Sequence, residues 1–332
     1  MSVFRRSLSS GSKVDASRPS GLASATAPPE IPRNDIGSIL VGVDGSPRGW
    51  EALEWAAAEA ASRDCSLRIM HVFHSSSAFA PVPWDISIDG WTDNGIEAAK
   101  HILAEAAARA RLVAPTTPIT AYAQQGTATA ALLREGRSDT LIVLGQARKY
   151  GRVGRFRSVG RHVARRASCP VAIVSLTKSP AKGRLAGRVV VGLDGSENPL
   201  EVLGFAFRSA QRRAVGLTVI RASVPRCATL SGSDTSTSPM TTSRLKHAAA
   251  EDALQLCHQA FPDVEIEQQA YPGPSNLALL AGSSGAALLV IGAPRRRLNN
   301  APFGPVRRAA AWIAQSPVAV VRPASIPGST TR

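Results

Sequence analysis

Cysteine pairs and long apolar runs are missing from this sequence, and we expect no secretory leader. The four cysteines are scattered through 332 residues without a C-x-x-C pair: Cys65, Cys169, Cys227 and Cys257. Such usage argues against a disulfide-built fold and is typical of a reducing compartment. The apolar run Ala286 to Ile291 is far shorter than the roughly 20 residues of a membrane span, and the first 30 residues have no apolar segment of the secretory type. We therefore expect a cytoplasmic protein without a membrane segment.

Acidic residues are also in short supply. The chain has 39 Lys and Arg against 24 Asp and Glu, a formal net charge of +15, and eight cations without one acid fall between Arg148 and Arg166. Such a run favours a phosphate-rich ligand or nucleic acid, although most charge runs are solvated surface. Aromatic residues for base stacking are few there, only Tyr150 and Phe156, and no reader motif is visible. A polyanion site at 148–166 therefore stays a minor hypothesis.

The chain contains an internal repeat. The segment that begins "SILVGVDGS" near the start returns as "RVVVGLDGS", so that Asp44 corresponds to Asp194 at an offset of 150. Further on, "TLIVLGQAR" returns as "ALLVIGAPR" and "CPVAIV" as "SPVAVV", both at an offset of 147. With 44% apolar residues, the length suits two packed domains. The repeat predicts two domains of the same fold.

Each copy alternates apolar strands with helices. In the first copy we expect strands at 38–43, 67–73, 119–123, 141–144 and 171–174. A turn at 44–47 should lead into a helix in which Trp50 and Leu53 recur at helical spacing, and further helices are expected over 96–112 and after Thr127, which would be an N-cap. Strands that are apolar throughout and separated by helices indicate a parallel sheet covered on both faces. The predicted fold class is α/β, with two similar doubly wound five-stranded domains. Such sheets bind ligands beyond the carboxyl ends of their strands.

The composition also predicts the domain boundaries. Residues 1–35 are rich in Ser, Pro, Ala and Arg without periodicity, which indicates a disordered tail. We expect the first domain at 36–177, a linker at 178–186 that contains "KSPAK", the second domain at 187–323 and a short tail at 324–332.

The ordered set "VGVDGS", "VLG" and "CP", repeated as "VGLDGS", "VIG" and "SP", resembles a tandem member of the universal stress protein family. The resemblance extends from Ile36 to Pro323 and implies a nucleotide α-hydrolase-like fold. It implies ATP, accompanied by Mg²⁺, as the ligand in many members, and domains that pair through their fifth strands. Here those strands are Val171 to Val174 and Val318 to Val321.

The resemblance also implies a set of nucleotide-binding positions. Asp44 would contact the ribose or the adenine edge, and an apolar slot near Val72 and Leu144 would take the base. In the first half the set is Gly42, Val43, Asp44, Val72, Leu144, Gly145, Arg148, Arg157, Ser158 and Val159. In the second half it is Asp194, Ala222, Ile291, Gly292, Arg295 and Gly304. Asp44 has a second interpretation, because Asp-Gly-Ser-Pro is strong turn chemistry in any protein.

The phosphate loop departs from the family pattern, G-x-x-G followed after about nine residues by G-[S/T]. Arg148 and Arg157 occupy glycine positions in the first half, and Pro305 occupies the hydroxyl position in the second. Arginine restricts the backbone but is a good bidentate partner for phosphate. Ser158 can serve as a phosphate donor or as an ordinary N-cap. We expect the first half to hold the better site and the second to be weak or empty.

No pattern in the sequence argues for catalysis. The six histidines never combine with Cys or carboxylates at zinc spacing, and a G-x-S-x-G elbow is missing. His71 and His74 flank the end of a strand, where a histidine bonded at the edge of the sheet is expected. The sequence predicts a non-enzymatic, nucleotide-binding stress-response protein with an unidentified protein partner. The alternative is a nucleotide-free scaffold in which the two halves pair, and homodimerisation of the chain stays open.

Overall fold

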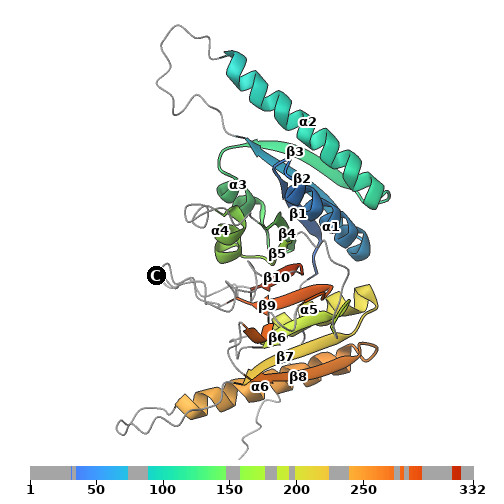
Figure 1. Ribbon diagram of the computed structural model, residues 1–332, viewed down its shortest axis with the longest axis vertical. Coiled ribbons are helices and arrows are strands. Elements are labelled where there is room, and N and C mark those ends of the chain that lie inside the picture. Colours follow the sequence, from blue (N-terminus) through green and yellow to red (C-terminus); the bar gives the residue numbers. More distant parts are fainter. Residues whose placement is uncertain are drawn as a thin grey trace, which may run out of the picture. The chain divides into compact units, whose positions relative to one another are not determined.

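Ten parallel and antiparallel strands join into one sheet in the computed structural model (Figure 1), with the order β3-β2-β1-β4-β5-β10-β9-β6-β7-β8. The structure describes residues 31, 35–73, 89–146, 158–175, 185–193, 199–223, 239–272, 277–279, 284–293 and 316–322. The predicted tail at 324–332 and the "KSPAK" segment of the linker lie outside these residues, as does the predicted tail at 1–35 apart from Ile31 and Asp35.

The first half alternates strands and helices as predicted. Its elements are β1 (Ser38–Val43), α1 (Pro47–Arg63), β2 (Ser66–Phe73), α2 (Asp89–Val113), β3 (Ile119–Gln125), α3 (Ala128–Glu135), β4 (Thr140–Gly145), α4 (Val159–Arg166) and β5 (Val171–Val174). Neighbouring strands within this half are parallel throughout. Thr127 occupies the N-cap position of α3, although its side chain makes no capping hydrogen bond.

The second half repeats the arrangement. Its described elements are β6 (Val189–Leu193), α5 (Pro199–Arg213), β7 (Leu217–Ser223), α6 (Pro239–Ala260), β8 (Ile266–Pro272), β9 (Leu288–Gly292) and β10 (Val318–Val321). Its strands are parallel to one another as well. The α/β class with two doubly wound halves is therefore confirmed.

The strands alternate their side chains between the two covered faces. Ile39 and Val41 pack with α1 and α2 in one apolar cluster, whereas Leu40 packs with α3 and α4 in another. Figure 1 shows these helix pairs on opposite sides of the first-half strands. The second cluster continues through the second half and includes Leu289 and Val318. One apolar layer thus runs through both halves.

The halves join through their fifth strands, the pairing expected from the resemblance. β5 and β10 are antiparallel, with Ala172 opposite Ala319. Each of these strands is buried along its whole length. Because an unpaired buried strand edge invites aggregation, the pairing protects both edges within one chain.

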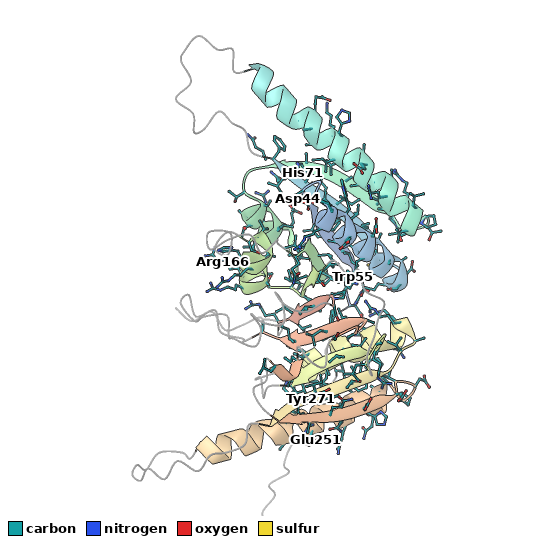
Figure 2. The ribbon with its side chains drawn as sticks, in the orientation of Figure 1. Asp44, Trp55, His71, Arg166, Glu251 and Tyr271 are labelled. Atoms are coloured by element: carbon teal, nitrogen blue, oxygen red, sulfur yellow. The ribbon has the colours of Figure 1, made fainter. Side chains whose placement is uncertain are left out.

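Two helices add a reciprocal contact at this boundary. Arg63 of α1 lies over the Phe205 ring of α5 at 5.4 Å, and Arg213 of α5 lies over the Trp55 ring of α1 at 5.9 Å. Trp55 is labelled at the boundary between the halves in Figure 2. Glu59, which is 4% exposed, accepts from both Arg63 and Arg213. Removal of this carboxylate would leave two arginines without their shared counter-charge.

Candidate functional site

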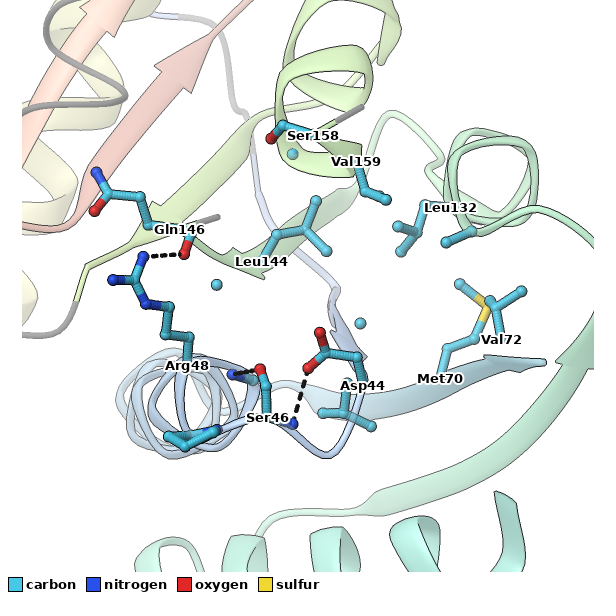
Figure 3. Close-up of a pocket in the computed structure, with 17 residues that line it drawn as sticks. Asp44, Ser46, Arg48, Met70, Val72, Leu132, Leu144, Gln146, Ser158 and Val159 are labelled. Carbon is cyan, nitrogen blue, oxygen red and sulfur yellow. Dashed lines mark hydrogen bonds between the residues drawn. The ribbon is translucent and has the colours of Figure 1, made fainter. Parts of the chain in front are cut away.

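The topology creates a natural binding position at the end of β1. Strand β1 pairs with β2 on one side and with β4 on the other. The crossovers that follow β1 and β4 therefore run in opposite directions and leave a gap between them at the ends of these strands. Ligands of open α/β sheets bind at such switch points. A cavity of about 690 Å³ lies here, between the ends of β1 and β4 (Figure 3). Its size falls within the range of small-molecule sites.

The polar wall of this cavity is the turn that follows β1. Asp44 Oδ1 accepts a hydrogen bond from the Ser46 backbone N–H at 3.0 Å, and Ser46 Oγ caps α1 by accepting from Gly49 N–H at 3.1 Å. Gly45 has a φ of +76°, which glycine adopts without the strain that a side chain would bring. Asp44 therefore stabilises the turn and also lines the cavity. The two sequence interpretations of Asp44 are compatible.

Arg48 joins the two crossovers that frame the cavity. Its Nη1 donates to the Gln146 carbonyl, directly after β4, at 2.7 Å (Figure 3). The backbones also approach closely: a Cβ on Gly145 would lie 2.7 Å from the Arg48 carbonyl oxygen. Glycine at 145 is thus required by the approach of α1 to β4. The Arg48 guanidinium places a permanent positive charge at the wall.

The opposite wall is apolar. Met70 and Val72 of β2, Leu132 of α3, Leu144 of β4 and Val159 of α4 line it, and Figure 3 shows their side chains gathered on one side of the cavity. An apolar slot opposite polar groups suits the face of a heteroaromatic base. The slot predicted near Val72 and Leu144 lies in this wall.

Gly42 brings this wall close to β1. A Cβ on Gly42 would lie 2.8 Å from a methyl group of Leu144 and 3.4 Å from one of Leu132. In the second half, a Cβ on Gly192 would lie 2.5 Å from a methyl group of Leu279, the counterpart of Leu132. The glycine–leucine packing is thus a property of both copies.

Three helices begin at the cavity. The first turns of α1 and α4 and the first residue of α3 line it, and none of the three helices carries an acid in its first turn. Helix N-termini present unpaired N–H groups and a partial positive charge, which favour an anion. Ser158 caps α4, with its Oγ accepting from Arg161 N–H at 3.4 Å. The cavity therefore combines an apolar wall with an electropositive one.

The structure brings together eight of the predicted residues. Those that line the cavity are Gly42, Val43, Asp44, Val72, Leu144, Gly145, Ser158 and Val159. In the second half, Ala222 lies in β7, while Ile291 and Gly292 end β9, with Ile291 in register with Gly192 of β6. The others lie outside the described residues: Arg148, Arg157, Asp194, Arg295 and Gly304. The roles of the whole set stay predictions.

Sequence reasoning missed nine of the described lining residues, among them Arg48, Met70 and Leu132. The repeat carries a signal for Leu132, because Leu279 stands at the equivalent place. Arg48 has no such signal, since its counterpart is Asn198. His71, in contrast, behaves as predicted: its Nδ1–H donates to the Val43 carbonyl at 2.8 Å.

The described residues hold neither a candidate metal centre nor a candidate membrane span. No group of three or more His, Cys, Asp or Glu among them is placed to hold a metal ion. None of the described helices combines the length and the apolar character that crossing a membrane requires.

Comparison with known proteins agrees with the geometry. The family model described as "Universal stress protein family" matches residues 36–175 and again 186–322. Universal stress protein Rv2005c of Mycobacterium tuberculosis is 27% identical over 298 residues, which cover 88% of this chain and 98% of that protein. Universal stress protein Rv3134c of the same species is 26% identical over 253 residues, 76% of this chain and 87% of that protein.

A solved structure shares the fold. The crystal structure of a universal stress protein from Archaeoglobus fulgidus aligns with a TM-score of 0.62 and 16% identity, over 88% of this chain and 98% of that one. Together with the family model that matches both halves, these relatives identify the chain as a tandem, two-domain member of the universal stress protein family.

Proposed function

We propose that the first domain binds an adenine nucleotide as a regulatory ligand and does not turn it over. The observation that carries this proposal is the cavity at the switch point, with an apolar wall opposite Arg48 and three helix N-termini. A purine base joined to phosphates matches both walls, because its base is a flat heteroaromatic ring and its phosphates are anionic. We also propose that the protein acts in the cytoplasm, a compartment in which thiols such as those of Cys65, Cys169 and Cys257 stay reduced.

The walls suggest how the ligand lies. The base would pack between Val72 and Leu144, the ribose hydroxyls would donate to the Asp44 carboxylate, and the phosphates would lie toward Gly145 and Ser158. Asp44 is the one carboxylate among the described residues of the cavity. Mg²⁺ would accordingly be held chiefly by the phosphates, as this ion commonly is. We propose that the second domain binds weakly or not at all, because Pro305 removes a hydroxyl and an amide donor.

A bound nucleotide can regulate only if it favours one conformation of the protein. The cavity is bounded by the starts of α1 and α4, so a bound nucleotide would hold these two helix ends in one arrangement and change the surface that a protein partner meets there. Catalysis is no part of the proposal, because we find no general base or nucleophile pair that the described geometry brings together at the cavity.

Calorimetric titration with MgATP tests the proposal. Asp44→Ala removes the ribose acceptor and should weaken binding roughly 10- to 100-fold, the effect of a lost charged hydrogen bond. Asp44→Asn keeps an oxygen that can accept from the Ser46 N–H, and its MgATP affinity should lie between those of the wild type and Asp44→Ala. The comparison distinguishes the contribution of the carboxylate charge from that of the turn. Glu97→Ala, an exposed acid of α2, is the control for net charge and should bind like the wild type.

Two alternatives predict other results. A nucleotide-free scaffold, favoured by the role of Asp44 in its own turn and by the β5–β10 pairing, shows no binding at millimolar MgATP. For a polyanion site in 148–166, Asp44→Ala leaves the affinity unchanged, and the affinity falls steeply between about 50 and about 200 mM salt. Either result would overturn the proposal.

A further inference from the structure

A residue of the second half supports the helix that begins at the nucleotide cavity. Arg322 follows β10 directly, and its Nη2 donates to the carbonyls of Ala164 at 3.1 Å and Arg165 at 2.7 Å. These carbonyls belong to the last turn of α4. The last four carbonyls of a helix lack partners within the helix, so Arg322 satisfies two of them from the other copy.

The other end of the same helix lines the cavity. Ser158, Val159 and Gly160 stand at the cavity wall. Gly160 is four residues before Ala164, about 6 Å along the helix at about 1.5 Å per residue. Arg322 contacts the opposite end of α4 and is not among the residues that line the cavity. It can act only through α4, as a positioning residue.

Helix α4 needs such support. An eight-residue helix is unstable on its own and depends on tertiary contacts. Val163 and Ala164 supply some of them, because they are buried in the apolar cluster that also contains Val318 and Val320 of β10. A cation at the carbonyl end also complements the helix dipole, whose positive end faces the cavity.

The arginine is not repeated in the sequence. At the offset of 147, the counterpart of Arg322 in the first half is Ser175, which carries no charge. The second copy thus supplies a cation for which the first copy has no equivalent at the corresponding position. This asymmetry agrees with a working site in the first domain and a reduced one in the second.

We propose that Arg322 makes the first-domain nucleotide site depend on the docked second domain. The proposal rests on the proposed function for its ligand. With Arg322 in place, α4 keeps its N-terminus at the cavity, and nucleotide binding and docking of the two halves favour each other. Thermodynamic linkage requires this effect to be reciprocal.

The test compares Arg322→Gln, Arg322→Lys and Arg188→Gln in the full chain. Arg188 is the matched control, because it also donates to a backbone carbonyl, that of Leu217, but lies within the second half. We expect Arg322→Gln to speed amide hydrogen exchange in α4 and to weaken MgATP binding about five-fold, the lower range of coupling between sites. Arg322→Lys keeps the charge at the helix end and should restore part of the exchange protection in α4 and part of the MgATP affinity. Arg188→Gln should change neither the exchange in α4 nor the MgATP affinity.

Unchanged exchange in α4 together with unchanged affinity in Arg322→Gln would overturn the proposal, as would equal effects in Arg188→Gln. If the wild type binds no nucleotide, the proposed function fails, while the exchange of α4 still decides whether Arg322 positions the helix. If Arg322→Gln does not fold, Arg322→Lys is compared with the wild type instead. In that comparison, five-fold weaker MgATP binding with wild-type amide exchange in α4 would contradict a positioning role for Arg322.

Discussion

Gly145→Ala tests the close approach on which the cavity depends. The added Cβ would lie 2.7 Å from the Arg48 carbonyl oxygen and 2.9 Å from its carbonyl carbon, where ordinary contacts begin at 3.4 Å. The first turn of α1 must therefore move by about 0.7 Å, the difference between these distances. Because both neighbours are backbone atoms, no side-chain rotation can relieve the clash.

Overpacking of this kind costs about 1–3 kcal/mol. For a chain of this size that unfolds as one unit we expect a fall in Tm of about 1–4 °C. The movement also separates Arg48 from the Gln146 carbonyl, so MgATP affinity should fall about ten-fold, which corresponds to about 1.4 kcal/mol.

Thermal unfolding and calorimetric titration measure the two effects. Gly37→Ala is the control, because its Cβ would meet its nearest neighbour, Asp139 Oδ2, at an ordinary 3.4 Å. A Gly145→Ala protein as stable as this control, with wild-type affinity, would refute the argument that Arg48 and Gly145 fix the shape of the cavity.

Two further predictions concern buried groups. Glu59→Gln leaves Arg63 and Arg213 without their shared carboxylate and should lower the free energy of unfolding in urea by about 3–5 kcal/mol. The control Glu97→Gln, on the exposed surface of α2, should change it by no more than about 0.5 kcal/mol. Equal effects of the two substitutions would contradict the role of Glu59 between the two halves. Burial raises the pKa of Cys169 and Cys257 to about 12 each, so a thiol reagent at pH 8 should leave both unlabelled until the protein is denatured. Because the folded thiols hold their protons more tightly than unfolded ones, their contribution to stability is complete below about pH 8.5 and is lost as the pH rises toward about 12. Rapid labelling of Cys169 in the native protein would contradict this. So would a pH dependence of the unfolding free energy that Cys169→Ala leaves unchanged.

The repeat made most of the fold predictable. An offset of 150 between Asp44 and Asp194 revealed two copies, and continuous apolar runs such as Leu141 to Leu144 indicated buried parallel strands. Local turn chemistry correctly predicted a turn between β1 and α1, although the helix begins at Pro47, within the predicted turn. These features depend on neighbours in sequence, for which residue type is a good guide.

Contacts between distant segments could not be predicted in the same way. Arg48 reaches Gln146 across 98 positions, and Arg322 reaches Ala164 across 158. Neither arginine has a charged counterpart in the other copy, so the repeat gave no hint of them. Their roles follow from the packing of crossovers and halves, which residue types alone do not determine.

The most direct test of the nucleotide proposal is a crystal structure of the full chain grown with saturating MgATP or a non-hydrolysable analogue. We predict one nucleotide per chain in the first-domain cavity, with its base between Val72 and Leu144 and its ribose at Asp44. A cavity filled by protein side chains with no nucleotide bound, or equal occupancy of both domains, would contradict the account.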